Sequence, residues 1–183
     1  MSTVSGYLYL DYLINESSEG DSMASAGPVV HRPRLGVLKS SYSDGSSAPN
    51  QADLVYSVTG SVSASGTVTV DLGTGGGLTN RFGESIVPFA SVVAILLINR
   101  STTAADVLSL GPHTTNGLSA PFRGTNPLVD VVPGTSSTKP GILYLENPSG
   151  WTVSDGSADT LRIVEQGGSN AVPYDLLILG RSA

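Results

Sequence analysis

The sequence predicts an all-β protein: an antiparallel β-sandwich or jelly-roll-like domain that follows an extended N-terminal arm. Three observations support this prediction. Residues 54–72 alternate between apolar and small polar side chains, which is the two-residue period of a half-buried strand. Short apolar segments then recur about every 10–16 residues, bounded by turn-forming residues and without a helical period between them. Residues 1–51 differ from the rest, because polar stretches that contain Gly and Pro dominate there.

Length and composition fit one folded domain with an appended arm. The chain has 183 residues, of which 39% are hydrophobic and 13% are charged. This balance supports a buried core rather than disorder. A formal net charge of −6 disfavours binding of nucleic acid through a basic surface. The absence of cysteine excludes disulfides and thiolate metal sites.

Two further absences bear on location. No stretch reaches the roughly 18 apolar residues of a membrane span. The first residues lack the basic region that precedes the apolar stretch of a secretory signal. We therefore expect a protein that is made in the cytoplasm without a signal peptide and that does not bind a membrane.

Residues 1–51 are expected to form the arm, and residues 52–183 the β-sandwich. Within the arm, two short apolar segments at 7–14 and 29–38 are candidates for strands. Residues 40–51 consist almost entirely of turn-forming types and predict a loop. So little apolar sequence among so many turn signals indicates an extended arm rather than a self-contained fold.

The alternating run at 54–72 must change direction. Every even position in it is apolar or glycine. A single strand of that length would span about 60 Å, whereas strands usually have about 5–6 residues. The chain must therefore turn near Gly60 or Gly66. Because the even positions stay apolar on both sides, we expect a loop with an odd number of residues or a bend that carries the chain into a second sheet.

The remaining strands follow from short apolar segments. Residues 92–99 are apolar on both faces, which indicates a central strand. Further strands are expected at 107–110, 128–132, 142–145, 160–164 and 174–179. Residues 102–110 are the one segment for which a helical turn is an alternative. The single tryptophan, Trp151, begins a strand and is expected to pack in the core.

The sequence predicts no catalytic, cofactor-binding or metal-binding residue, and we expect a protein that is not an enzyme. His31 and His113 lie in unrelated contexts, and no nucleophile motif accompanies them. The glycine-rich segment 73–77 lacks the lysine of a phosphate-binding loop and is interpreted as a connecting loop. Residues 155–159 match the first ligand positions of a calcium loop, but the later Gly and Glu are missing, which favours a turn.

Two patterns are kept as weak alternatives. Glu84 and Glu146 are the carboxylates to compare for a glycan-cleaving enzyme, which would hold them roughly 5–10 Å apart in a cleft. Glycosylation sequons begin at Asn15 and Asn99, and both are interpreted as chance matches.

The arm also contains residue types that protein interfaces favour. Tyr7, Tyr9 and Tyr12 lie in its first apolar segment, and Arg32 and Arg34 form its main basic concentration. These five are the candidate interface residues. The tyrosines could instead close an edge of the sandwich, and the arginines could lie in a solvated loop.

Two stretches of the sandwich region resemble a domain of tailed-phage and prophage structural proteins. The first is residues 52–111, which include LTNRFGESIVPFASVVAILLIN at 78–99. The second is residues 147–183, which include GWTVSDGSADTLRIVEQGGSNAVPYDLLILGRSA at 150–183. The resemblance covers about two thirds of the chain, roughly residues 52–183. Residues 1–51 resemble no family that we identify.

The resemblance implies a β-sandwich protein of the phage particle. We expect a decoration or cement protein on the outer capsid surface, bound to the major capsid protein and associated with itself as a homotrimer. The arm would reach a neighbouring capsomer. The alternatives are a tail, fibre or baseplate component that binds a receptor or glycan and, more remotely, the glycan-cleaving enzyme.

Overall fold

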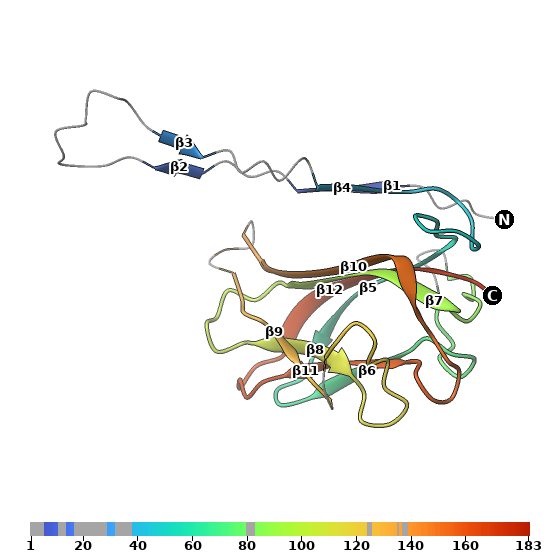
Figure 1. Cartoon of the computed structure of the whole chain (residues 1–183). Coiled ribbons are helices and arrows are strands. Elements are labelled where there is room, and N and C mark those ends of the chain that lie inside the picture. The colour runs from blue at the N-terminus through green and yellow to red at the C-terminus, as the bar shows by residue number, and fades with distance from the viewer. Residues whose placement is uncertain are drawn as a thin grey trace.

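The structure is a computed structural model of the chain, and it describes residues 6–10, 14–16, 29–31, 38–79, 83–123, 126–134, 136 and 139–183. The described residues form strands and turns and contain no helix (Figure 1). Two four-stranded antiparallel sheets face each other and enclose the core. The predicted all-β sandwich is therefore confirmed.

Eight strands build the sandwich. They are β5 (Leu54–Val62), β6 (Thr67–Asp71), β7 (Ser91–Asn99), β8 (Leu108–Pro112), β9 (Val129–Val131), β10 (Gly141–Thr152), β11 (Thr160–Glu165) and β12 (Val172–Arg181). The first sheet has the order β10-β7-β12-β5, and the second has the order β6-β11-β8-β9. The antiparallel pairs β5–β12, β6–β11, β7–β10 and β8–β9 are nested inside one another and alternate between the two sheets. This nested order is that of a jelly roll.

The alternating run of the sequence forms β5 and β6, which lie in different sheets. The chain crosses between the sheets at residues 63–66, where the amide of Gly66 donates to the carbonyl of Ser63 at 2.8 Å. Of the two options that the sequence allowed, the bend into a second sheet is therefore correct. Both sheets face the same core, so Val62 before the bend and Val70 after it are buried, and the even positions stay apolar throughout.

The core lies between the two sheets. Its fully buried aliphatic side chains include Ile95, Leu97, Leu108, Leu110, Leu161, Ile163, Leu176 and Ile178. Burial of this apolar surface is the main force that holds the sandwich together. Trp151 packs against the same core, as predicted. It does not begin a strand, however, because it lies next to the last residue of β10.

The helical alternative for residues 102–110 is wrong. The chain forms a turn there and enters β8 at Leu108. The backbone amides bond to side chains here and not to the carbonyls of a helix. The amide of Ser101 donates to Asn99 Oδ1 at 3.0 Å, and the amide of Thr103 donates to Ser101 Oγ at 3.1 Å. Such local bonds from Ser and Asn compete with helix formation.

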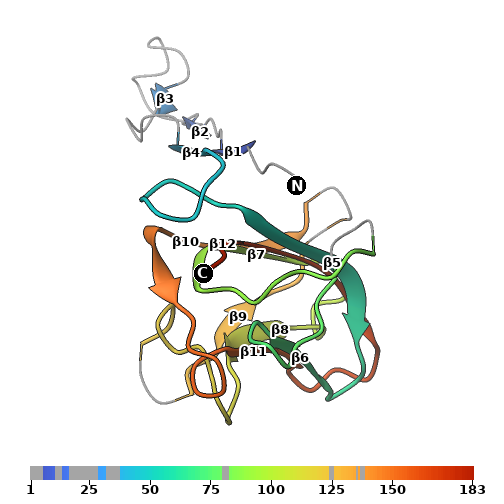
Figure 2. The same ribbon diagram turned by 90° about the vertical axis from the view of Figure 1, so that its right-hand side faces the viewer.

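The N-terminal part adds four short strands. They are β1 (Gly6–Leu10), β2 (Ile14–Glu16), β3 (Val29–His31) and β4 (Leu38–Tyr42). β1 pairs with β4 and β2 pairs with β3, so these strands are also nested antiparallel pairs. We call them the arm ribbon, and Figures 1 and 2 show it on the side of the sandwich formed by the first sheet. The loop predicted at 40–51 is shorter than expected, because β4 continues to Tyr42.

Candidate functional site: the arm ribbon and its attachment

The five predicted interface residues fall in the arm. Tyr7 and Tyr9 lie in β1, where they stand opposite Ser41 and Lys39 of β4 and therefore share one face of the ribbon. Tyr12, Arg32 and Arg34 lie outside the described residues. The interface role of all five stays a prediction.

Tyr42, the last residue of β4, attaches the ribbon to the sandwich. Its side chain is buried with Ala52, Val93 and Leu179 in a cluster separate from the main core. Val93 belongs to β7 and Leu179 to β12, the two central strands of the first sheet. The ribbon therefore starts on the outer face of that sheet.

A partly buried hydrogen bond also holds Tyr42 in place. The phenol of Tyr42 donates to Glu146 Oε1 on β10. Burial, followed by this bond, raises the pKa of Tyr42 well above its ordinary value, and the nearby Tyr144 adds to the effect. Glu146 was one of the two carboxylates kept for glycan cleavage, and the structure gives it this contact with the arm. Glu84 lies exposed in the segment between β6 and β7.

The raised pKa predicts a pH dependence that Tyr42→Phe should reduce. A raised pKa means that the folded chain holds the proton more tightly, so the stabilisation is complete below about pH 10 and is lost as the pH rises further. At pH 7 we expect Tyr42→Phe to be about 1 kcal/mol less stable than the natural chain, because it lacks the bond to Glu146. Between about pH 9 and 11 this difference should narrow.

Urea unfolding at several pH values measures this effect. Tyr56 and Tyr174 also have raised pKa values through burial, so both proteins lose stability at high pH and only their difference reports on Tyr42. A stability difference that stays constant from pH 7 to 11 would contradict the assignment.

Arg181 forms the second attachment, at the end of β12. The residue is buried, and its guanidinium donates to three backbone carbonyls: Nε to Gln51 at 3.0 Å, Nη1 to Ser149 at 3.1 Å and Nη2 to Pro148 at 2.5 Å. Gln51 belongs to the segment that leads out of the arm, and the other two lie on β10. One side chain thus joins the arm's exit segment to both β10 and β12.

Backbone contacts extend this attachment. The amide of Asn50 donates to the carbonyl of Pro148 at 3.1 Å, and the amide of Asp53 donates to the carbonyl of Gly180 at 3.1 Å. The carboxylate of Asp53 accepts bonds from the amide and hydroxyl of Ser182 at 2.8 and 2.5 Å. The segment between the ribbon and β5 is therefore held along its length. Sequence analysis missed this arrangement, since nothing local to Arg181 marks it.

The connecting loop at residues 73–77 and the turn at residues 155–159 pack against each other. The hydroxyl and amide of Thr74 donate to Asp155 at 2.7 and 3.0 Å, and these bonds lower the pKa of that carboxyl. A side chain at Gly73 would collide with Asp155 Oδ1, which explains a glycine there. Residues 154–158 close a turn, as predicted. Among the described residues, no group of three or more His, Cys, Asp or Glu side chains could hold a metal ion.

Asn99 organises the opposite end of the first sheet. Its side chain is fully buried, and its amide nitrogen donates to the carbonyls of Asp106 at 2.8 Å and Val131 at 2.9 Å. The sequon at this position is therefore closed to glycosylation in the folded chain. Its role is to join the end of β7 to the following turn and to β9.

No protein-family model matches the chain, and no curated protein matches it. In the part of the chain that the structure describes, no helix is long and apolar enough to cross a membrane.

Proposed function

We propose that the protein is a structural component of a phage particle, a decoration or cement protein that binds the major capsid protein on the outer surface of the head. The observation that carries this proposal is a jelly roll whose N-terminal ribbon is fastened to one sheet at Tyr42 and Arg181. Jelly rolls recur in viral shells. Because a fold alone does not assign a function, the resemblance of residues 52–111 and 147–183 to phage structural proteins is the second support.

The proposed mechanism is multivalent binding on a repeating lattice. Three copies form a trimer. Each sandwich contacts the capsomer beneath it, and the far end of its arm reaches a neighbouring capsomer. A second contact by the same molecule is intramolecular once the first has formed, and such linkage raises binding by about 100-fold or more without stronger individual contacts. The net charge of −6 also disfavours association with the packaged DNA. The protein would be made in the host cytoplasm and would reach the virion by assembly.

A tail, fibre or baseplate component is the second candidate, because jelly rolls also occur in lectin domains. A glycan-binding tip presents aromatic side chains to its ligand. The exposed large apolar residues of the described chain are all aliphatic, namely Val87, Val129, Val132 and Ile142. This composition favours the head over a glycan-binding tip.

Co-sedimentation with heads that lack the protein tests the proposal. The full chain should saturate the heads at a stoichiometry set by the lattice. Deletion of residues 1–41, which spares Tyr42, should weaken binding by about 100-fold. The double substitution Arg32→Ala and Arg34→Ala should weaken it in the same direction if these residues contact the capsid.

Arg123→Ala is the matched control, because Arg123 is an exposed arginine of the sandwich. Thermal unfolding checks that each variant is folded. Binding that is unchanged by the deletion would overturn the role of the arm. Binding to tails and not to heads would favour the second candidate.

A further inference from the structure

The outer faces of the two sheets differ in chemistry. In the first sheet, the residues that alternate with the core positions are mainly apolar. They are Val55 on β5, Leu96 and Ile98 on β7, Ile142 and Tyr144 on β10, and Leu177 and Leu179 on β12. The corresponding positions of the second sheet include Thr67, Thr69, Asp130 and Arg162. We call the seven apolar residues the outer apolar face. Leu179, at one end of it, already packs against Tyr42 of its own chain.

These residues are neighbours across the four strands of the sheet and are not isolated apolar positions. Ile142 stands opposite Ile98, and Leu96 stands between Tyr144 on one side and Leu177 on the other. Ile142 is 60% exposed. A sandwich normally places polar residues on its outward positions. Contiguous apolar patches on a surface are typical of sites that bind a protein, a membrane or a ligand.

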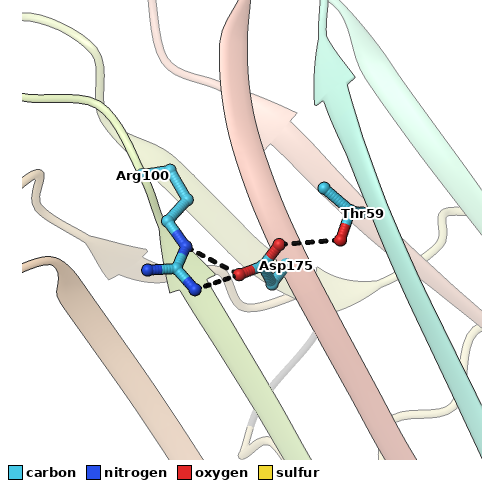
Figure 3. A network of polar contacts seen from close by, with 3 residues as sticks. All are labelled: Thr59, Arg100 and Asp175. Carbon is cyan, nitrogen blue, oxygen red and sulfur yellow. Dashed lines mark hydrogen bonds and ion pairs between the residues drawn. The ribbon is translucent and has the colours of Figure 1, made fainter. Parts of the chain in front are cut away.

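A polar network borders the outer apolar face. Arg100 Nε donates to Asp175 Oδ2 at 2.6 Å, and Thr59 Oγ1 donates to Asp175 Oδ1 at 2.9 Å (Figure 3). Asp175 lies on the outer side of β12, opposite Ile98 of β7 and Thr59 of β5. An apolar centre beside a polar rim is the usual anatomy of a protein interface.

The arm ribbon has a face of matching chemistry. Pairing places Gly6 opposite Tyr42, Leu8 opposite Ser40 and Leu10 opposite Leu38. Residues opposite one another share a face of a ribbon, so positions 8, 10 and 38 lie on the face that carries Tyr42. Tyr42 itself packs on Val93 and Leu179 of the first sheet. The ribbon face that carries Tyr42 thus has apolar residue types at three further positions.

The ribbon needs such a surface, because a two-stranded ribbon alone is marginally stable in water. Figure 1 shows that the end of the ribbon formed by β2 and β3 extends beyond the sandwich of the same chain. A second copy of the chain presents the same outer apolar face. When the ribbon of each copy lies on the next copy, the contact is head-to-tail, and a suitable rotation closes it into a ring.

We propose that the outer apolar face is the docking surface for the arm ribbon of a second copy of this chain. The inference rests on the self-association included in the proposed function, and not on head binding. It identifies both halves of the subunit contact: the ribbon positions 8, 10 and 38 from one copy and the outer apolar face of the first sheet from the next.

Measuring the oligomeric state of variants tests whether the outer apolar face forms the contact between copies. Ile142→Asp places a charge in the proposed contact at a position that is largely exposed, so the fold should tolerate it. Val87→Asp is the matched control, because Val87 is 55% exposed and lies outside the outer apolar face. By mass photometry and light scattering across a concentration series, the natural chain should be oligomeric. Ile142→Asp should raise the dissociation constant at least about tenfold, and Val87→Asp should leave it unchanged.

Cross-linking identifies which segment binds the outer apolar face. The natural chain has no cysteine, so Leu10→Cys and Ile142→Cys each introduce a single thiol. When these two variants are mixed and treated with a short bis-maleimide, we expect a mixed dimer that carries one chain of each. Leu10→Cys mixed with Val87→Cys should give little product.

Three outcomes would overturn the proposal: a natural chain that is monomeric at tens of micromolar, equal effects of Ile142→Asp and Val87→Asp, or a cross-link that forms only within the chain of a Leu10→Cys/Ile142→Cys double variant. The last outcome would place the ribbon on its own sheet. All of these measurements are made without heads. An oligomer that passes them but fails to sediment with heads would contradict only the proposed function.

Discussion

Replacing Arg181 with alanine is expected to lower the free energy of unfolding by about 3 kcal/mol. Arg181 is only 8% exposed, and its guanidinium donates to the carbonyls of Gln51, Pro148 and Ser149. Removing it leaves three acceptors without their donor, and each unsatisfied buried group costs about 1–3 kcal/mol unless water reaches it. Urea denaturation followed by tryptophan fluorescence measures the change, because Trp151 packs against the core.

Arg100→Ala is the matched control for this prediction. Its side chain is 43% exposed and pairs with Asp175, and exposed ion pairs contribute about 0–1 kcal/mol. Arg181→Lys should recover only part of the loss, because an ammonium group lacks the planar fork that meets three separate carbonyls. Equal losses in the Arg181 and Arg100 variants would mean that the three carbonyl bonds do not hold the fold together.

Asn99→Asp is expected to destabilise the protein by about 4 kcal/mol, although the two side chains have nearly the same shape. The buried amide nitrogen donates to the carbonyls of Asp106 and Val131. A carboxylate has no proton to donate at neutral pH, so it would face both carbonyls as a buried and unpaired charge. Partial protonation at low pH should restore some stability, which gives the variant a characteristic pH dependence.

Asn126→Asp is the control that separates the effect of burial at Asn99 from any general cost of replacing asparagine with aspartate. Asn126 is exposed and adopts a positive φ of 53°, a conformation that aspartate also tolerates. We expect a change within about 0.5 kcal/mol for that variant. Both substitutions can be compared in one set of thermal and urea unfolding curves. A loss at Asn99 no larger than that at Asn126 would contradict the burial of the amide.

Local patterns predicted the sandwich strands well, because a two-residue period reports directly on burial. The run at 54–72 indicated both β5 and β6 and restricted how the chain could pass between them. The apolar segment 92–99 was correctly interpreted as a central strand, since β7 lies between β10 and β12. Its second apolar face, however, does not point into the sandwich. Leu96 and Ile98 belong to the outer apolar face, which the periodicity of one strand could not distinguish from core.

The attachment of the arm could not be predicted in the same way. Arg181 contacts a carbonyl 130 positions earlier in the chain, and Tyr42 contacts a carboxylate 104 positions later. No local period or motif encodes such distances. Asn99 was noticed only as part of a sequon, although its two donated bonds explain why that amide stands at the end of β7. The candidate residues Tyr7 and Tyr9 were placed in a strand, but the residues that fasten the arm were missed.

The nested strand order makes presentation of the arm depend on completion of the fold. The innermost pair, β8–β9, closes a loop between residues 110 and 129, whereas the outermost pair, β5–β12, joins residues 54 and 180. Loop closure becomes more costly in entropy with length, so the outermost pair carries the largest closure cost. Tyr42 and Gln51 are held by Leu179 and Arg181, which belong to that pair. A chain that has not joined its first and last sandwich strands therefore lacks the contacts of Leu179 and Arg181 with the end of the arm, and the arm is fully attached only when the fold is complete.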